Sequence, residues 1–388
     1  MRVLICHNYY QQPGGEDVCF ESEAALLERK GHSVHRYTLT NDLIRFMCGF
    51  RAAARAVWSQ SAYRELQCAV RRGGVQVVHF HNTFPLISPA AYYAVRRQGA
   101  RVVQTVHNYR LGCPNALLFR NGEVCEKCLG KKFAWPAVAH ACYRNSVAAT
   151  GTVAIMLAVH RLLRTWSTLV DIYVTLTEFA REKLIEAGVA PAKIVVKPNF
   201  VFPDPGPGLG RGGYALFAGR LVAEKGIDTV LSAWDKLPVK PPLRIAGDGP
   251  LAPQVAALAE REKNVVFLGR VSRAELLSLM QEAVVLVFPS KCYEGFPMLV
   301  AEAYATGLPV VASPIGSLKS LVHDGRTGLH FRPGDAQDLA SRIEWVFSHR
   351  REVSNMRAQA RQEFEASYTA GRNYELLIDI YERALGAR

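Results

Sequence analysis

The sequence predicts an α/β protein with two doubly wound domains, each a parallel sheet with helices on both faces. The chain has 388 residues, which is long for one domain and natural for two. Short apolar runs alternate with helical patterns in both halves, and a proline- and glycine-rich segment interrupts the alternation. We therefore expect an N-terminal domain over residues 1–205 and a C-terminal domain over residues 206–365, facing one another across a central cleft. Residues 366–388 are predicted to contain a final helix that could pack back on the first domain.

The strands and helices follow one another in order along the chain. In the first half, a helix over 16–32 stops at Gly31, and the predicted strands are 2–7, 33–39, 75–81, 100–107, 171–177 and 193–198. The segment 201–213 has three prolines and five glycines, and we expect a linker that buries nothing and fixes little structure. In the second half, the predicted strands are 214–219, 242–247, 265–269, 284–290 and 308–313.

Composition limits the classes of partner and compartment. The formal net charge of +13 suggests an anionic partner, such as nucleotide phosphates, a lipid phosphate, an acidic membrane surface or nucleic acid, although a merely basic soluble protein has the same charge. Met1 and Arg2 lead directly into a predicted strand rather than a secretory signal, so a cytoplasmic location is expected for the nine cysteines. Residues 146–166 are apolar but are interrupted by His160 and two arginines, which indicates an amphipathic helix rather than a membrane span.

Cationic and glycine-rich loops follow the apolar strands of the second half. The segment GRLVAEKG, residues 219–226, places Arg220 and Lys225 in one loop. A guanidinium fork and an ammonium point charge suit a diphosphate, although a solvated basic loop has the same composition. The glycines of GDGP, the first of which is Gly247, allow a tight turn and close ligand approach. Because ligands of open parallel sheets bind beyond the carboxyl ends of the strands, these are candidate binding loops.

Two glutamates flank a proline in the apolar segment PSKCYEGFPMLVAEAYATGLPVVAS, residues 289–313. Pro297 suits the first turn of a helix that ends near residue 307, so Glu294 lies in the preceding loop and Glu302 on the helix. A helix N-terminus suits an anion, and a carboxylate can accept two hydrogen bonds from sugar hydroxyls. The pattern favours a nucleotide-sugar, with Glu294 toward the sugar and Glu302 toward the ribose. One helix-dipole carboxylate beside one surface carboxylate is the alternative.

Together these motifs resemble those of the retaining glycosyltransferases of family 4, which have the GT-B fold of two Rossmann-like domains. The resemblance rests on GRLVAEKG, GDGP, the E-x7-E spacing of Glu294 and Glu302, and HDGRTG at residues 323–328. In the first half, QQPGGEDVCFESEAALLERKGHSV is similar to the family's N-terminal glycine loop, helix and turn. The motifs span nearly the whole chain. They imply transfer of a sugar from a nucleotide-sugar to an acceptor hydroxyl with retention of configuration, as in cell-surface polysaccharide synthesis.

The resemblance also implies roles for individual residues. The implied catalytic set is His107, Glu294, Arg220 and Lys225, with the two cations on the donor diphosphate and the glutamate on the donor sugar. Glycines of the N-terminal loop would approach the phosphate and the acceptor. Asn108 stands where the family usually has an aspartate, which puts in doubt any role that needs a charge there. The implied donor-binding set is Gly14, Gly15, Arg220, Lys225, Gly247, Glu294, Gly295, Phe296, Pro297, Met298 and Glu302.

The implied mechanism needs no metal for the diphosphate, and the chain has no DxD motif. As the anomeric C–O bond breaks, the leaving diphosphate gains negative charge, which Arg220, Lys225 and the helix end would stabilise. The leaving phosphate is expected to take the acceptor proton on the same face of the sugar. Glu294 is expected to bind the donor sugar rather than attack it.

A cysteine-rich insertion over residues 113–142 is a second, independent signal. Its spacing is C-x11-C-x2-C-x13-C, and a C-x2-C pair with two further cysteines can supply a tetrahedral thiolate site for structural zinc. Free buried thiols, disulfides and a redox role are the alternatives. Four thiolates leave no open position, so a catalytic zinc is not expected. The predicted metal ligands are Cys113, Cys125, Cys128 and Cys142.

The predicted partners are a nucleotide-sugar and a glycan or lipid-linked acceptor, and no nucleic acid. The helix at 146–166 and the basic residues around the cysteine insertion could hold the first domain on the cytoplasmic face of an anionic membrane, although an interior helix is equally compatible. Two other functions remain open. A zinc-bearing nucleic-acid binder would account for the charge and cysteines but not for the glutamate pair. A nucleotide-sugar epimerase or hydrolase would need carboxylate acid–base pairs that the sequence does not place.

Overall fold

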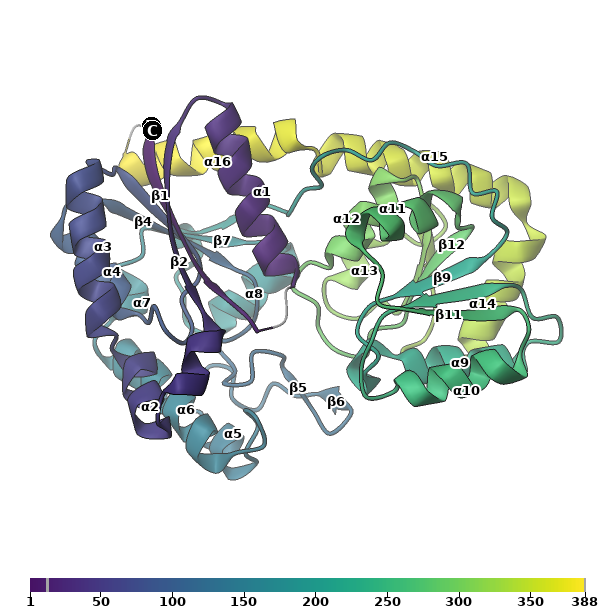
Figure 1. Ribbon diagram of the computed structural model, residues 1–388, viewed down its shortest axis with the longest axis horizontal. Helices are drawn as coiled ribbons and strands as arrows, with labels where there is room; N and C mark the ends of the chain where they lie inside the picture. Colours follow the sequence, from purple (N-terminus) through teal and green to yellow (C-terminus); the bar gives the residue numbers. More distant parts are fainter. Residues whose placement is uncertain (12–13, 387–388) are drawn as a thin grey trace. The chain divides into compact units, whose positions relative to one another are not determined.

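The chain forms two α/β units, each built on its own parallel sheet. A computed structural model describes residues 1–11 and 14–386 (Figure 1). The first unit comprises Met1–Leu118, Cys125–Asn199 and Gly371–Arg388, and the second comprises Phe119–Val124 and Phe200–Ala370. The chain leaves the first unit at residue 199, close to the expected division at 205, and the final helix belongs to the first unit.

The first unit has a six-stranded parallel sheet in the order β2-β1-β3-β4-β7-β8. Its inner strands are short runs of apolar residues buried on both faces, which is the usual pattern of a parallel sheet. The strands are β1 (Arg2–Tyr9), β2 (Ser33–Thr40), β3 (Val77–Asn82), β4 (Arg101–Val106), β7 (Ile172–Thr175) and β8 (Ile194–Val196).

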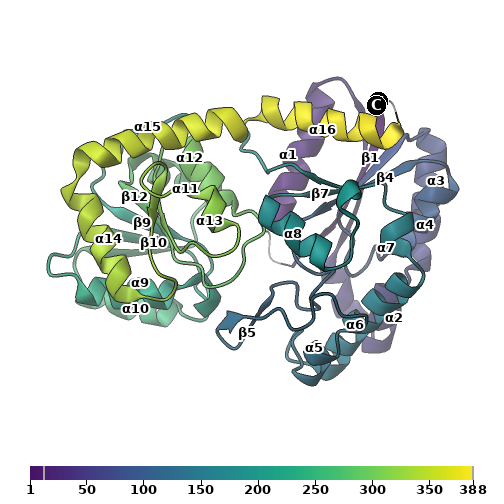
Figure 2. The same ribbon diagram turned by 180° about the vertical axis from the view of Figure 1, so that it is seen from behind.

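Helices cover both faces of this sheet, because alternate side chains of each strand point to opposite faces. Leu4 packs with α3, α4 and α8, whereas Val3 and Ile5 pack with α1 and α16. Figures 1 and 2 show α16, the last helix, lying along the first sheet beside α1. The helices of this unit are α1 (Gly15–Arg29), α2 (Gly49–Val57), α3 (Gln60–Gly73), α4 (Ala90–Arg97), α5 (Trp135–Ala139), α6 (Val147–Leu162), α7 (Thr165–Thr168), α8 (Glu178–Glu186) and α16 (Ala370–Leu385), with 3-10 helices η1 (Asn41–Phe46) and η2 (Pro191–Lys193).

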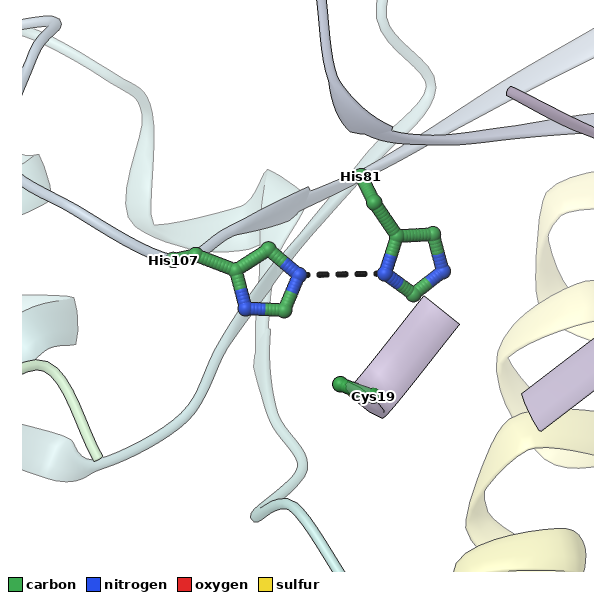
Figure 3. Close-up of side chains that lie close together, drawn as sticks. All are labelled: Cys19, His81 and His107. Atoms are coloured by element: carbon green, nitrogen blue, oxygen red, sulfur yellow. Dashed lines mark hydrogen bonds between the residues drawn. The ribbon is translucent and has the colours of Figure 1, made fainter. Parts of the chain in front are cut away.

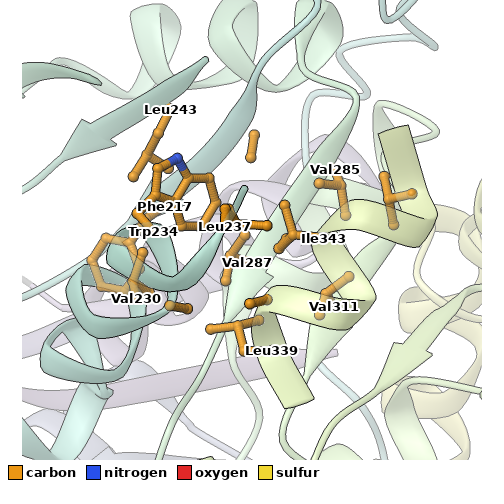
Figure 4. Close-up of a cluster of buried hydrophobic side chains, with 14 of the residues drawn as sticks. Phe217, Val230, Trp234, Leu237, Leu243, Val285, Val287, Val311, Leu339 and Ile343 are labelled. Carbon is orange, nitrogen blue, oxygen red and sulfur yellow. The ribbon is translucent and has the colours of Figure 1, made fainter. Parts of the chain in front are cut away.

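The second unit repeats the plan with a parallel sheet in the order β11-β10-β9-β12-β13-β14. Trp234 of α9 is fully buried in the core that α9, α10 and α14 form against this sheet (Figure 4). The strands are β9 (Ala215–Ala218), β10 (Leu243–Ala246), β11 (Val265–Gly269), β12 (Val285–Phe288), β13 (Val310–Ala312) and β14 (Gly328–His330). The helices are α9 (Ile227–Lys236), α10 (Ala252–Arg261), α11 (Arg273–Glu282), α12 (Met298–Ala305), α13 (Leu318–Leu321), α14 (Ala336–Ser348) and α15 (Arg350–Ser367), with 3-10 helix η3 (Ala223–Lys225).

Each sheet has a point at which the winding direction reverses. In the first sheet β1 lies between β2 and β3, and in the second β9 lies between β10 and β12. The loops that leave two such neighbouring strands diverge to opposite faces and leave a crevice at their carboxyl ends, where open α/β sheets bind ligands. The predicted doubly wound fold is confirmed in both units, and the topology alone selects the loops after β1, β3, β9 and β12 as candidate binding loops.

The linker differs from its prediction. We expected residues 201–213 to bury nothing, but the second part of this segment packs tightly against the second unit. The N–H groups of Gly208 and Gly210 donate to the carbonyl oxygens of Thr306 and Gln281 at 2.9 Å each. A Cβ on Gly208 would lie 2.1 Å from the Gln281 oxygen, so here glycine allows close backbone contact rather than flexibility.

The predicted helix at 146–166 is split in the structure. Helix α6 ends at Leu162, and Arg164 adopts a left-handed conformation with φ of 55° before the short α7 begins. One face of α6 is core, since Val153, Met156 and Leu157 are buried against α2. No helix in the described ranges is both long enough and apolar enough to cross a membrane.

Candidate active site

The loop after β9 is fixed against the end of β12 by a glycine. Gly226, which begins α9, has φ of 72°, and a Cβ there would lie 1.9 Å from the carbonyl oxygen of Pro289. Only glycine meets both demands, because the left-handed conformation disfavours a side chain and the backbone oxygen leaves no room for one. This approach places Lys225 next to the segment that carries Glu294.

Lys225 and Glu294 form an ion pair at the winding reversal of the second sheet. The Lys225 Nζ atom lies 2.6 Å from Glu294 Oε1, and the Ser290 hydroxyl donates to the same oxygen at 2.7 Å. Burial alone would lower the pKa of Lys225, but the Glu294 carboxylate and the neighbouring Cys292 raise the pKa overall. Lys225 is therefore a cation at neutral pH. The sequence predicted both residues as site residues but not their contact, since they are 69 positions apart.

Arg220 lies at the start of the same loop and is mainly exposed. Its side chain is 57% exposed, and its Nη2 atom lies 3.9 Å from Glu224 Oε1. The Arg220 charge acts to lower the pKa of Lys225, which shows that the two cations lie near one another. The loop thus carries one half-buried cation bound to a carboxylate and one that faces solvent, where it can move toward a ligand.

The second predicted glutamate has a partner that sequence reasoning missed. Glu302 lies on α12, is 6% exposed, and accepts from Arg273 Nε of α11 at 3.0 Å. Burial raises the pKa of Glu302, and Arg273 opposes that shift only in part. The missed signal was the arginine that follows Ser272, the residue whose hydroxyl caps the N-terminus of α11.

The predicted helix-end residues Gly295 to Met298 lie between these two carboxylates in the sequence. Pro297 is the N-cap of α12 rather than its first helical residue, and Phe296 is buried before it. A Cβ on Gly247 would lie 1.9 Å from the Gly219 carbonyl oxygen. The GDGP glycine therefore lets the loops after β9 and β10 pack on one another. Its expected part in close ligand approach stays a prediction.

The N-terminal QQPGG motif is described only in part, because Gln12 and Pro13 lie outside the described residues. Gly14 is the N-cap of α1, and its N–H donates to Asp17 Oδ2 at 2.7 Å. The other oxygen of Asp17 lies 2.6 Å from His7 Nε2 at the end of β1. Gly14 and Gly15 are exposed, and Asp17 joins their loop to the first sheet.

His107 follows β4 in the first unit and meets a second histidine. Its Nε2 atom lies 3.0 Å from Nδ1 of His81, at the end of β3 (Figure 3). Glu23 and Lys197, fully buried and ion-paired, lie behind His81. His107 also lines a pocket of the first unit. The pocket is lined by His81, Asn82, Thr83, Phe84, Ser88, Pro89, Tyr92, Gln104, Thr105, Val106, His107, Asn108, Arg110, Leu111, Met156, Leu157, Trp166 and Tyr173.

Asn108 acts as a neutral hydrogen-bond donor in this structure. Its amide Nδ2 donates to Glu16 Oε1 at 3.0 Å, so a neutral donor, rather than the aspartate usual at this position, meets a buried carboxyl. Burial raises the pKa of Glu16, and the Asn108 hydrogen bond opposes that shift. An aspartate here would put two carboxyl groups in contact, which accounts for the amide.

The histidine cluster fits hydrogen bonding better than a metal ion. Cys19, His81 and His107 each have a ligand atom within 4.8 Å of the others. However, burial raises the pKa of Cys19 well above its usual value, and its thiol donates to Asn199 Oδ1 at 3.0 Å. The facing nitrogens of the two histidines already share a proton, and the Lys197 ammonium lies behind them. A second group, Glu23 with His79 and His81, has the same ammonium against its carboxylate.

The four cysteines of the insertion lie close enough for their charges to interact. Burial, and after it the charges of Cys113, Cys142 and Cys125, raise the pKa of Cys128 to about 11. Cys113 and Cys128 are buried, and the Cys113 thiol donates to Asn115 Oδ1 at 2.9 Å. Among residues 1–11 and 14–386, these cysteines are not in any group with three ligand atoms within 4.8 Å, so a metal would have to draw the sulfurs closer.

Comparisons with known proteins agree with this organisation. Residues 14–199 match the model of the glycosyl transferase 4-like domain, and residues 210–363 match the glycosyl transferases group 1 model. A glycogen synthase of Mycobacterium tuberculosis is 32% identical over 159 residues, which are 39% of this chain and 38% of that protein. The sulfoquinovosyl transferase SQD2 of Arabidopsis thaliana is 31% identical over 156 residues, covering 39% and 30%. The matched segments thus span well under half the length of these curated relatives.

Solved structures match over the whole chain. The Anabaena protein Alr3699/HepE in complex with UDP has a TM-score of 0.69 at 17% identity, covering 98% of this chain and 99% of that one. Sucrose-phosphate synthase from Thermosynechococcus elongatus has a TM-score of 0.73 at 16% identity, covering all of both chains. None of these matches supports a nucleic-acid binder or an epimerase. The chain belongs to the GT-B glycosyltransferases, with a glycosyl transferase 4-like domain followed by a glycosyl transferases group 1 domain.

Proposed function

We propose that the protein transfers a sugar from a nucleotide-sugar to an acceptor hydroxyl and retains the anomeric configuration. The observation that carries this proposal is the Lys225–Glu294 pair at the winding reversal of the second sheet, 2.6 Å apart. Where the sugar of such a donor joins its diphosphate, a cation can bind the phosphates and a neighbouring carboxylate can accept hydrogen bonds from the sugar hydroxyls. The solved complexes of HepE with UDP, and with UDP and glucose, support the same class of donor.

The chemistry follows from where charge develops. The bond between the anomeric carbon and the phosphate oxygen breaks, a bond to the acceptor oxygen forms, and the acceptor proton passes to the leaving phosphate on the same face. Lys225 is already charged and oriented by Glu294, so it can stabilise the leaving diphosphate without reorganisation. Arg220, exposed at the loop start, would close on the same phosphates. No step requires a metal, and Glu294 binds hydroxyls rather than attacking carbon.

The proposal is tested with a panel of UDP-, GDP- and ADP-sugars, with mass spectrometry to detect transfer or hydrolysis. Lys225→Met should reduce kcat by about 10²–10³, the usual loss when one preorganised donor to a developing charge is removed. Lys240→Met is the matched control, because Lys240 pairs with Glu262 at 2.5 Å in an ion pair elsewhere in the second unit. Failure of every donor to bind or react would reject the function, and equal kcat values for the two variants would reject the role of Lys225.

The pocket beside His107 favours an acceptor with polar and apolar parts. Its lining combines amides and imidazoles with aromatic and aliphatic side chains such as Trp166 and Met156. The guanidinium of Arg110 lies 4.2 Å from the centroid of the Phe84 ring. A glycan or lipid-linked acceptor fits this mixture, and cell-surface glycan synthesis is the setting we propose. A survey of acceptors with one nucleotide-sugar identified above would test it, and transfer only to water would contradict it.

We propose that the first unit binds an anionic membrane surface through helices α2, α5 and α6. These helices and the preceding η1 carry exposed large apolar side chains, and α2 and α5 both pack on α6 (Figure 1). Phe46 and Phe50 are each 86% exposed, Leu162 is 84% exposed and Trp135 is 60% exposed. Exposed basic residues accompany them, which complements an anionic lipid surface. These basic residues are Arg45, Arg51, Lys131, Lys132, Arg144 and Arg164.

Vesicle flotation tests this surface with phosphatidylcholine vesicles that contain or lack phosphatidylglycerol. We expect binding only to the anionic vesicles, weakened by salt, and lost in Phe46→Ser/Phe50→Ser. Val239→Ser is the control, because Val239 is 82% exposed but lies in the second unit. Equal binding to both vesicle types, or by both variants, would contradict the proposal.

We also propose that Cys113, Cys125, Cys128 and Cys142 hold a structural zinc ion. Their mutual electrostatic influence supports it, and the insertion between β4 and α6 has only a short hairpin and helix α5 of regular structure. A thiolate tetrad would cross-link such a segment. Elemental analysis of fresh protein should find about one zinc per chain, lost in Cys125→Ser and kept in Cys48→Ser, whose cysteine is exposed and outside the insertion. Less than half an equivalent in the parent protein would reject the site.

A further inference from the structure

A fully buried charged cluster supports His107 from behind. Glu23 of α1 has no exposed surface, and its Oε1 atom pairs with the Lys197 ammonium, which is also fully buried. Its other oxygen, Oε2, lies 3.3 Å from Nε2 of His81. The described interactions therefore run as a line from Lys197 through Glu23 and His81 to His107, which lines the pocket.

The charges of this line are fixed. Burial alone would raise the pKa of Glu23, but Lys197 and then His81 and His79 bring it well below its usual value, so Glu23 is a carboxylate. Burial lowers the pKa of His81 despite the nearby carboxylate, and burial lowers the pKa of His107 well below its usual value. Both imidazoles are therefore neutral near pH 7, and each carries one ring proton.

The position of each proton follows from the carboxylate. His81 Nε2 lies 3.3 Å from Glu23 Oε2, and among the described residues neither atom has another hydrogen-bond partner. The carboxylate would repel a lone pair on this nitrogen, so the proton of His81 lies on Nε2. Nδ1 of His81 is then an acceptor, and His107 Nε2, 3.0 Å away, must donate to it. Nδ1 of His107 is left unprotonated. Figure 3 shows this second nitrogen on the side of the ring away from His81.

We propose that Glu23 and His81 are positioning residues that hold His107 in the Nε2-protonated tautomer, so that its Nδ1 accepts a hydrogen bond from a substrate hydroxyl. Lys197 keeps the carboxylate charged and in place. The identity of the hydroxyl as part of a sugar donor or acceptor rests on the proposed function, whereas the tautomer does not. Glu23 thereby sets the hydrogen-bonding character of His107 in the pocket without contacting a bound substrate.

The tautomer is measured directly by long-range 1H–15N correlation spectra of the full chain labelled at histidine. His107→Asn identifies the His107 signals by their loss. The expected parent spectrum has a protonated Nε2 and an unprotonated Nδ1 for His107. Glu23→Gln/Lys197→Met removes the buried pair together, so that no unpaired charge remains. This variant should show a mixture of His107 tautomers, with kcat reduced about tenfold, the effect of about 1.4 kcal/mol.

Tyr381→Phe is the matched control, because it removes a 2.9 Å hydrogen bond to Nδ1 of His79 in the same core and leaves the line intact. It should change stability but neither the His107 tautomer nor kcat. A parent spectrum with the proton on Nδ1 of His107 would overturn the proposal, and so would an unaltered tautomer and kcat in the double variant. If the tautomer is as expected but no sugar is transferred, the proposed function fails and the positioning of His107 stands.

Discussion

At the scale of single residues, carboxylates in apolar surroundings are explained by cations from other elements. Glu294 is bound by Lys225 from the loop after β9, and Glu302 by Arg273 from α11. An unpaired buried carboxylate would be neutralised or expelled, so each cation helps to keep its carboxylate charged. Burial raises the pKa of Glu302, so this carboxyl differs from an ordinary glutamate.

This difference predicts a pH dependence of nucleotide binding. A carboxylate accepts hydroxyl hydrogen bonds, and Glu302 takes up a proton at a higher pH than an ordinary glutamate. Affinity for a nucleoside diphosphate should therefore fall on acidification at a higher pH than the titration of an ordinary glutamate would give. Glu302→Gln should bind about tenfold more weakly at neutral pH and lose that dependence, as measured by calorimetry.

Glu262→Gln is the control for this pH prediction. Hydrogen bonding to Lys240 lowers the pKa of Glu262, which is the opposite direction from the shift of Glu302. Glu262 is also not one of the predicted site residues. An acid-sensitive affinity that survives in Glu302→Gln would assign the effect to another group.

At the scale of elements, glycines in the site loops act by letting backbones touch. Gly226 joins the loop after β9 to the end of β12, and Gly247 joins it to the loop after β10. These contacts bring together three loops whose strands are adjacent in the sheet order β10-β9-β12. The geometry of the Lys225–Glu294 pair therefore depends on backbone packing as well as on side chains.

Gly226→Ala should destabilise the second unit and disturb that pair. The left-handed conformation alone costs about 1–2 kcal/mol, and the contact with the Pro289 oxygen adds to it. Gly334→Ala separates the two effects, because Gly334 has φ of 76° with nothing within 4 Å of its added Cβ. Urea unfolding and hydrogen exchange over residues 215–236 should show a larger loss for Gly226→Ala by about 2 kcal/mol. An equal decrease in the free energy of unfolding for the two variants would mean that the close approach of Gly226 to the Pro289 oxygen does not contribute to the destabilisation.

The elements were predictable to the extent that their signals are local. Buried parallel strands are short apolar runs between turn residues, so the inner strands of both sheets could be located from the sequence. The sequence analysis did not predict β14, the last strand, or the hairpin of β5 (Phe119–Arg120) and β6 (Glu123–Val124), whose strands have only two residues each. The linker was misjudged because its glycines pack against Gln281, a contact that composition does not encode.

The candidate site was predictable only in its separate parts. Local motifs identified Lys225, Glu294 and Glu302, but their partners lie on other elements. The line from Lys197 to His107 joins four residues from four segments, and of these four the sequence predicted a site role for His107 alone. To predict which charged residues pair across a sheet, one must know which strands are neighbours, and the motifs of a single sequence do not give that order.

At the scale of the whole molecule, buried ionisable groups make the first unit sensitive to acid. Burial lowers the pKa of His79, His81 and His107 below the usual value. The unfolded chain therefore binds more protons than the native unit below about pH 6.5, and the stability that the neutral histidines retain above that pH is lost as pH falls.

Thermal unfolding followed by hydrogen exchange tests this expectation. Acidification from about pH 7 to about pH 5 should unfold β3 and β4 at progressively lower temperature. His79→Gln should weaken the dependence, because it removes one of the three neutral groups. A melting temperature of the first unit that does not change over this range would contradict the protonation states assigned to the cluster.

The last helix has a consequence for how the protein is made. Leu377, Ile380 and Tyr381 of α16 complete the core that also contains Val3 and Ile5. A ribosome therefore releases the whole second unit before the residues that close the first one emerge. The usual order, in which N-terminal domains mature first during translation, is reversed here, and β1 stays incompletely covered until α16 has been made.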